Sequence, residues 1–184
     1  RIVAGTYLMA AAITGGKLLL KGIIPSHLDA VVAKMREAGV TIQATEDSLE
    51  VVESKLKAVE TLRTLPYPGF PTDLQAPMMA LLTLARGKSG ITESVFEARF
   101  RHVGELNRLK AQIAVEGRTA LIQGVEKLSG AEVEATDLRA GAALILAGLA
   151  AEGQTVVHNA KYIDRGYERI EEDLQKLGAR ITRI

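Results

Sequence analysis

The sequence predicts an α/β fold built from three similar units, and three observations support this prediction. Apolar, alanine-rich helix patterns occur three times along the 184 residues, at 7–22, 78–93 and 144–159, and a glycine and a short strand pattern end each of them. A second helix pattern with a charged face follows each one. Strand patterns then follow the second helices. Self-similarity at regular spacing indicates one duplicated unit.

The glycines Gly16, Gly87 and Gly153 stand where a helix C-cap prefers glycine. The second helices end at nearly equal distances after these glycines, which also favours duplication. We expect these second helices at 27–39, 101–111 and 166–178.

The strands of the three units are expected on both sides of the helices. A strand follows each second helix, a hairpin partner follows in the first two units, and a strand precedes the apolar helix in the last two. The expected strands are 40–44, 48–53, 58–64, 112–116, 119–125, 131–137 and 179–184. Turn residues at 45–47 and 117–118 support the two hairpins. The full unit is therefore strand–helix–strand–helix–strand–strand.

The three units, at about 1–56, 57–126 and 127–184, are expected to form a single domain. The first unit lacks its first strand and the third lacks its last. Missing strands leave unpaired sheet edges. Because the sequence also starts at Arg1 rather than Met, we expect an excised piece of a longer protein.

The two helices of a unit have different patterns. The first is apolar on nearly all sides, which predicts a buried, central position. The second carries charges such as Glu168, Arg169 and Glu171 on one face, which we interpret as a solvated helix face. Three buried helices predict pseudo-threefold packing of helices inside a shell of sheets.

The composition excludes several classes of protein. The net charge is +1, with no basic run and few aromatic residues, which argues against a nucleic-acid partner. There is no cysteine, so disulfides and thiolate chemistry are excluded within the chain and a cytoplasmic location is compatible. No apolar run reaches the roughly 18 residues that span a bilayer, so we expect no membrane partner.

Two of the apolar helices begin with the pair Thr-Asp, which places Asp73 and Asp137 at helix starts. Either carboxylate could cap its helix. Alternatively, the parallel helix starts form a surface that attracts anions. Arg139 lies in the first turn, where its charge opposes the helix dipole. It indicates either an anionic ligand or an ion pair with Asp137 or another acid.

Two further arginines, Arg99 and Arg165, follow strands in corresponding places of units two and three. Together with Arg139 they could form an oxyanion site, because the guanidinium group suits carboxylate and phosphate. The three histidines have no metal-ligand spacing and are expected at the surface or in packing roles; they are His27, His102 and His158. We expect no metal and no cofactor.

Several long runs resemble one enzyme family. These runs are AGTYLMAAAITGG, FPTDLQAPMMALL, GITESVFEARFRHVGELNRL, VEKLSGAEVEATDLRAGAALILAGLAAEG and YIDRGYERIEEDLQKLGA. They closely resemble the UDP-N-acetylglucosamine enolpyruvyl transferases, in order and over nearly the whole chain. The related shikimate-pathway transferases share the fold, but their own motifs differ from these.

The resemblance implies an inside-out α/β barrel of two domains, each with three units of the kind described above. This chain would be the C-terminal large part. The family transfers the enolpyruvyl group of phosphoenolpyruvate to the 3-hydroxyl of UDP-N-acetylglucosamine and releases phosphate, in the first committed step of peptidoglycan synthesis. The active site lies in the cleft between the domains.

The resemblance also implies roles for individual residues. Asp73 would contact the sugar 3-hydroxyl and is a candidate general base. Val95 would contact the nucleotide sugar through its backbone, with Phe96 beside it. The cleft would also contain Arg99, Asp137, Arg139 and Arg165. Of these, Arg139 and Arg165 would bind the anionic groups of phosphoenolpyruvate, as preorganised positive charge for the leaving phosphate.

The chain departs from the family at one residue and in the absence of several motifs. Ala98 stands where some members carry Asn. The loop with the reactive Cys or Asp, the Lys-Asn pair and a further Arg belong to the N-terminal domain, which is not in this sequence. We therefore expect the chain alone to be inactive. One alternative is a non-catalytic piece that only binds nucleotide sugar or serves a structural purpose, and another is the shikimate-pathway relative.

Overall fold

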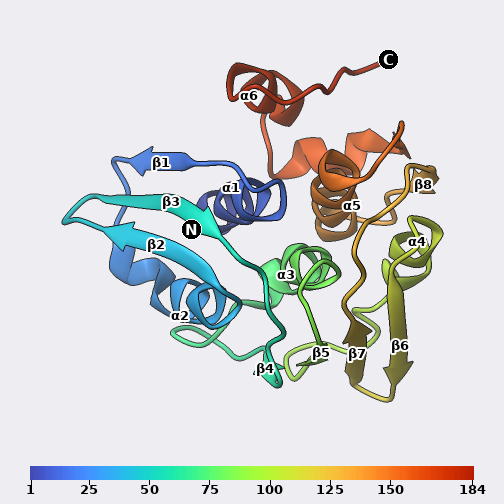
Figure 1. The fold of residues 1–184 in the computed structure, drawn as a ribbon, viewed down its shortest axis with the longest axis horizontal. Coiled ribbons are helices and arrows are strands. Elements are labelled where there is room, and N and C mark those ends of the chain that lie inside the picture. Colours follow the sequence, from blue (N-terminus) through green and yellow to red (C-terminus); the bar gives the residue numbers. More distant parts are fainter.

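Three helices pack against one another at the centre of the fold, which a computed structural model describes for all 184 residues. They are α1 (Ile2–Ile13), α3 (Gln75–Leu82) and α5 (Leu138–Ala150), and each contacts the other two. Every residue of α3 is buried. Figure 1 shows the three helices nearly end-on, with the sheets and the remaining helices around them. The apolar character of these segments therefore correctly predicted their central position.

The first sheet has the strand order β1-β3-β2 and is antiparallel. Its strands are β1 (Leu18–Lys21), β2 (Val40–Ala44) and β3 (Ser48–Ser54). The short helix η1 (Pro25–Leu28) and α2 (Asp29–Glu37) connect β1 to β2. Alternate residues such as Ile42, Leu49 and Val51 are buried, so one face of this sheet joins the core.

The second sheet has the strand order β4-β5-β7-β6. Its strands are β4 (Leu62–Arg63), β5 (Lys88–Thr92), β6 (Gln112–Glu116) and β7 (Thr119–Gln123), and α4 (Val103–Arg108) precedes β6. Only β4 and β5 are parallel to each other. The turn η2 (Thr72–Leu74) connects this region to the start of α3.

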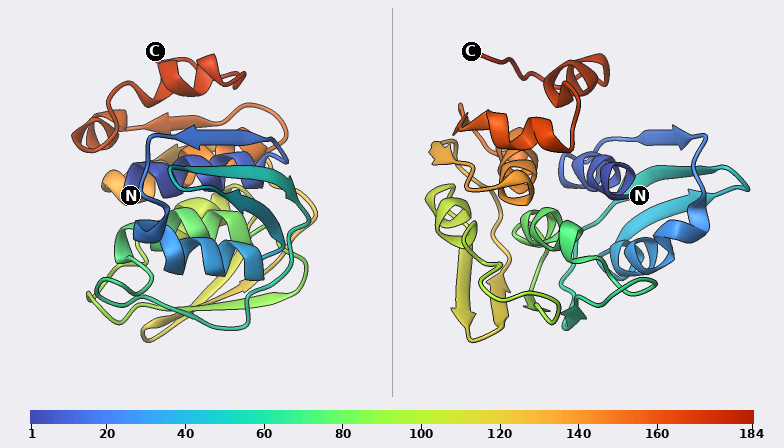
Figure 2. Two further views of the ribbon diagram at one scale, coloured as in Figure 1. Left: turned by 90° about the vertical axis from the view of Figure 1, so that its left-hand side faces the viewer. Right: turned by 180° about the vertical axis from the view of Figure 1, so that it is seen from behind.

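The third sheet contains only β8 (Glu132–Glu134) and β9 (Val156–His158), which are parallel. After β9 follow η3 (Ala160–Arg165) and α6 (Ile170–Lys176). The views in Figure 2 place α6 and the C-terminus at one end of the molecule. None of the helices is long and apolar enough to cross a bilayer.

The predicted strand at 179–184 is wrong, because these residues form no strand and belong to none of the three sheets. A strand requires a hydrogen-bonding partner, which a sequence pattern alone does not supply. The predicted strand at 58–64 is reduced to Leu62–Arg63. The Val59 N–H donates to the Ser89 hydroxyl at 3.0 Å instead of to a backbone carbonyl, which interrupts the regular ladder.

The glycine predictions need a correction at the end of α1. Gly15, not Gly16, has the positive φ of 68°. The Gly16 N–H donates to the Ala11 carbonyl and the Gly15 N–H to that of Ala12, which is a Schellman motif with Gly15 in the left-handed position. Gly87 and Gly153 have positive φ, but they lie beyond the last residues of α3 and α5 rather than directly at the helix ends.

Candidate active site

Asp73 and Arg139, two of the predicted site residues, meet although they are far apart in the sequence. Asp73 lies in η2, just before α3, and Arg139 lies in the first turn of α5. Arg139 Nε donates to Asp73 Oδ1 at 2.5 Å, and their side chains are 31% and 40% exposed. An ion pair this exposed contributes only about 0.2–1 kcal/mol to stability. The ion pair matters for the site because it places a negative and a positive charge at the starts of two central helices, α3 and α5.

Arg99 is the third charged residue of this cluster. Its Nη1 lies 3.7 Å from the same oxygen, Asp73 Oδ1. That distance is too long for a hydrogen bond, and Nη1 is buried without a hydrogen-bond partner. The guanidinium group lies over the Phe96 ring, 4.1 Å from its centroid, which is a cation–π contact. Two guanidinium groups therefore converge on one carboxylate, and the cluster carries a net positive charge.

Asp137 acts as a helix cap. Its Oδ1 accepts hydrogen bonds from the N–H groups of Arg139 at 2.8 Å and Ala140 at 3.2 Å. The capping interpretation of Asp137 is thus confirmed. The same interpretation of Asp73 is wrong, because neither η2 nor α3 has a side-chain cap. The Asp73 carboxylate faces Arg139 instead, so an ion pair with an acid is present for that arginine; the anionic ligand of Arg139 stays a prediction.

Tyr167 is a further residue near this pair, and sequence reasoning missed it. Its buried hydroxyl lies 2.7 Å from the Thr6 hydroxyl of α1. Burial raises the pKa of Tyr167; the Asp73 charge raises it further, and the Arg139 charge opposes the change. Tyr167 is therefore close enough to both charges to sense them. The signal that could have found it is its place two residues after Arg165.

A glycine allows α1 to approach the turn that carries Asp73. A Cβ at Gly5 would collide with the side chain of Leu74, the residue after Asp73. No other residue fits this approach without a shift. The packing of α1 against η2 thus fixes the position of the Asp73 backbone.

Arg165 is not brought into contact with the other charged residues. It ends η3 and is exposed, and its side chain forms no hydrogen bond or ion pair in the structure. The next residue, Gly166, packs closely against Leu138 at the start of α5. The Arg165 backbone is thus anchored beside the helix start that carries Asp137 and Arg139, while its guanidinium group remains free.

Val95 and Phe96 lie in the loop after β5. Their N–H groups donate to Glu93 Oε1 at 2.9 and 3.1 Å. A backbone contact from Val95 to a ligand would therefore have to come from its carbonyl oxygen. The Phe96 ring is 48% exposed, so it is accessible beside Arg99. Glu93 was missed, since no local pattern indicates that a Glu after a strand is buried.

Of the histidines, His102 has the most unusual surroundings. It is 3% exposed, and its Nε2 has no hydrogen-bond partner. Burial lowers its pKa to about 4, against an opposing effect of Asp137. The packing role expected for His102 is confirmed. His158 is at the surface, where its Nε2 lies 3.1 Å from Glu132.

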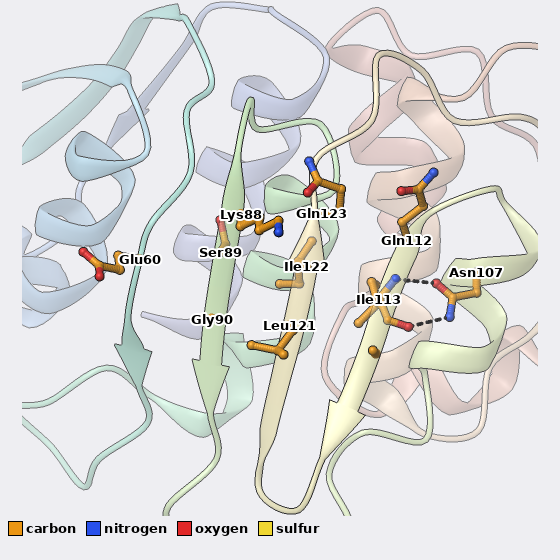
Figure 3. Close-up of a pocket in the computed structure, with 11 residues that line it drawn as sticks. Glu60, Lys88, Ser89, Gly90, Asn107, Gln112, Ile113, Leu121, Ile122 and Gln123 are labelled. Atoms are coloured by element: carbon orange, nitrogen blue, oxygen red, sulfur yellow. Dashed lines mark hydrogen bonds between the residues drawn. The ribbon is translucent and has the colours of Figure 1, made fainter.

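One cavity lies away from the charged cluster. It has a volume of about 630 Å³ and lies against the sheet β4-β5-β7-β6 (Figure 3). None of the seven predicted site residues lines it. Asn107, which does, is occupied in two hydrogen bonds with the Ile113 backbone. A second cavity of about 460 Å³ is lined by Phe96, Arg99 and Arg118 among others, and it borders the charged cluster.

The comparison with protein families is decisive for the classification. The model of the family described as EPSP synthase (3-phosphoshikimate 1-carboxyvinyltransferase) matches residues 1–174. The chain belongs to this family.

Curated relatives within this family carry a more specific name. A protein of Caldanaerobacter subterraneus named UDP-N-acetylglucosamine 1-carboxyvinyltransferase 1 is 54% identical over 183 residues, which cover 100% of this chain and 44% of the relative. A protein of Desulfofundulus thermocisternus named UDP-N-acetylglucosamine 1-carboxyvinyltransferase is also 54% identical, and the match covers 75% of that relative. The chain thus spans less than half the length of the Caldanaerobacter relative.

Solved structures agree with this classification. The enolpyruvyl transferase NikO from Streptomyces tendae superposes with a TM-score of 0.87 at 29% identity, covering 98% of this chain and 43% of that one. EPSP synthase from Acinetobacter baumannii has a TM-score of 0.73 at 17% identity, covering 95% and 45%. The second likeness shows the fold alone.

Proposed function

We propose that this chain is part of an enzyme that transfers the enolpyruvyl group of phosphoenolpyruvate to the 3-hydroxyl of UDP-N-acetylglucosamine. Phosphate is released, and the reaction is the first committed step of peptidoglycan synthesis in the cytoplasm. The observation that carries this proposal is the convergence of Arg139 and Arg99 on Asp73 Oδ1. It occurs in a chain that is 54% identical to relatives named for this activity.

Asp73 is suited to bind and deprotonate a sugar hydroxyl. Its Oδ1 faces Arg139 and Arg99, whereas Oδ2 has no partner. One oxygen can thus hold the carboxylate in a fixed orientation while the other accepts a proton or a hydrogen bond from the 3-hydroxyl. The exposure of 40% leaves this side chain accessible to a ligand.

The arginines are suited to bind the anionic groups of phosphoenolpyruvate. Arg139 keeps guanidinium donors beyond the Nε that Asp73 occupies, and Arg165 is exposed and without a partner. Arg99 Nη1 is also without a hydrogen-bond partner. Charge that builds up on a leaving phosphate is stabilised by fixed donors of this kind. Asp137 serves the site by holding the first turn of α5, on which Arg139 stands.

We further infer that the three helix–sheet units are repeats of one motif and form a single domain of an inside-out α/β barrel. The three mutually packed helices and the three sheets around them support this inference. The N-terminal domain of the same enzyme would face the Asp73 cluster as its partner. The chain alone is then half of a cleft, and we expect it to be inactive.

Phosphate release by the full-length protein that carries residues 1–184 tests this function. With phosphoenolpyruvate present, we expect release to depend on UDP-N-acetylglucosamine and not on shikimate 3-phosphate. The isolated chain, assayed in parallel, should release none. Release that depends on shikimate 3-phosphate instead would contradict the proposal and favour the shikimate-pathway reaction.

A further inference from the structure

Glu93, at the end of β5, is a charged residue that the proposed reaction does not yet use. It is 1% exposed, and its carboxylate accepts four hydrogen bonds. No Lys or Arg nitrogen lies within ion-pair distance of this carboxylate. A buried carboxylate has a high desolvation cost unless donors surround it. The four donors therefore offset the cost of burying the Glu93 carboxylate, and each of them depends on this carboxylate as its acceptor.

The four donors come from three different segments. Thr64 lies just after β4, and its hydroxyl donates to Glu93 Oε1 at 2.8 Å. Thr72, in η2, donates to Oε2 at 2.9 Å. The N–H groups of Val95 and Phe96 donate to Oε1. One carboxylate thus joins the end of β4, the turn that carries Asp73 and the loop after β5.

Thr64 links a further residue of the loop, Ser94, to the Glu93 carboxylate. Its hydroxyl oxygen also accepts the Ser94 N–H at 2.9 Å. Since this hydroxyl accepts from Ser94 and donates to Glu93, its single proton is used on Glu93. Three consecutive N–H groups of the loop, from Ser94 to Phe96, are therefore bound directly or indirectly to the same acceptor.

Arg118 holds the same loop from its other side. Its Nε donates to the Glu93 carbonyl at 2.8 Å, and its Nη2 donates to the Phe96 carbonyl at 3.2 Å. Both guanidinium contacts are made to backbone, so they set the course of the loop and not the charge of the Glu93 side chain. The loop is therefore fixed at both its N–H groups and its carbonyls.

We propose that Glu93 is a positioning residue, which fixes the distance between the turn carrying Asp73 and the loop carrying Val95 and Phe96. Thr72 is the direct neighbour of Asp73, and Phe96 supports the Arg99 guanidinium at 4.1 Å. The Glu93 carboxylate thus binds both the turn that carries Asp73 and the loop that carries Val95 and Phe96, which are the two sides of the proposed nucleotide-sugar site. This inference rests on the proposed function, and it assigns Glu93 to nucleotide-sugar binding rather than to phosphoenolpyruvate.

Two variants of Glu93 in the full-length protein test this role. Glu93→Met retains the length of the side chain but removes both acceptors. We expect the KM for UDP-N-acetylglucosamine to rise about tenfold or more, because several coupled hydrogen bonds are lost. The KM for phosphoenolpyruvate should change by less than about threefold. Glu93→Gln should restore most of the loss, since its oxygen can replace Oε1 and its amide can donate to the Thr72 hydroxyl.

Two hydroxyl variants complete the design. Thr72→Val removes only the link to the Asp73 turn, and we expect a smaller rise in the nucleotide-sugar KM, about threefold to tenfold. Ser89→Ala is the matched control, because it also removes a buried hydroxyl hydrogen bond of β5, the one to Val59, but far from Asp73. We expect this control to leave both KM values unchanged.

The outcomes separate the positioning role from the proposed function. A folded Glu93→Met protein with an unchanged nucleotide-sugar KM would overturn the role, and so would equal rises in both KM values. If Glu93→Met does not fold, Thr72→Val decides: an unchanged nucleotide-sugar KM overturns the role, and a selective rise supports it. A wild type that releases phosphate without UDP-N-acetylglucosamine would instead contradict the proposed function itself.

Discussion

Arg139 in α5 and Asp73 in η2 are joined by a hydrogen bond of 2.5 Å between Nε and Oδ1. This contact links the starts of two central helices, α3 and α5. Asp137 fixes the first turn of α5 by capping it, and Gly5 lets α1 pack against Leu74 next to Asp73. The charged cluster is therefore held by the packing of all three central helices.

Arg165 provides a test of where phosphoenolpyruvate binds. Its guanidinium group is exposed and without a partner, so replacing it should cost little stability. In the full-length protein, we expect Arg165→Ala to raise the KM for phosphoenolpyruvate about tenfold or more, through the loss of a charged hydrogen bond. Steady-state kinetics with each substrate varied in turn measure this effect.

Lys161→Ala is the matched control for Arg165, because it removes an exposed cation from the same short helix, η3. This control should leave both KM values unchanged. If Arg165→Ala altered only the affinity for the nucleotide sugar, the role assigned to Arg165 would be wrong.

Gly5 provides a test of how α1 supports the Asp73 turn. A methyl group at Gly5 would collide with Leu74, and overpacking of this kind costs about 1–3 kcal/mol. Alanine also favours the helix at Gly5, as it does at Gly104, so we expect Gly5→Ala to be less stable than Gly104→Ala by about 1–3 kcal/mol in the free energy of unfolding, as measured by urea denaturation. Gly104→Ala in α4 is the control, because a Cβ there meets no atom within 4 Å.

The Gly104→Ala control should be neutral or more stable by about 0.5–1 kcal/mol, since alanine favours a helix. Equal changes in the free energy of unfolding for Gly5→Ala and Gly104→Ala would show that α1 or the Leu74 side chain can shift at no cost. The turn that carries Asp73 would then not depend on this packing.

His102 provides a test by pH. Burial lowers its pKa to about 4 from an ordinary value of 6.5. Because the unfolded chain takes up the proton first, stability is complete above about pH 6.5 and decreases as the pH falls towards 4. The loss is on the order of 3 kcal/mol at the acid end. Urea denaturation of wild type and His102→Phe between pH 7 and 4 measures it.

His102→Phe should show a shallower decrease than wild type, because it lacks this titration. Identical slopes for the two proteins would contradict the assignment of a neutral, buried His102.

The elements of the fold that local patterns determine were predictable from the sequence. Strands 40–44 and 112–116 match β2 and β6 to the residue, because alternation and nearby turn residues define them. The sequence pattern at 179–184 could not reveal that no strand forms there, because a strand needs a partner strand, which a local pattern does not indicate.

The sequence identified residues of the candidate site, but it did not predict which of them contact one another. The run FPTDLQA identified Asp73, yet the local pattern indicated a helix cap there. Its actual partner, Arg139, lies far along the chain, and a contact of this kind depends on the packing of α3 against α5. Glu93 was missed for the same reason, because its burial depends on Thr64 and Thr72, which come from other segments.

The turnover of an Asp73→Ala variant in the full-length protein tests the central claim most directly. The variant removes the oxygen that faces the two arginines and the free oxygen proposed to act on the sugar hydroxyl. With UDP-N-acetylglucosamine and phosphoenolpyruvate saturating, we expect kcat for phosphate release to fall about 10²–10⁴-fold, with cooperative unfolding retained. A kcat within a few-fold of wild type would contradict the role of Asp73 and the site built around it.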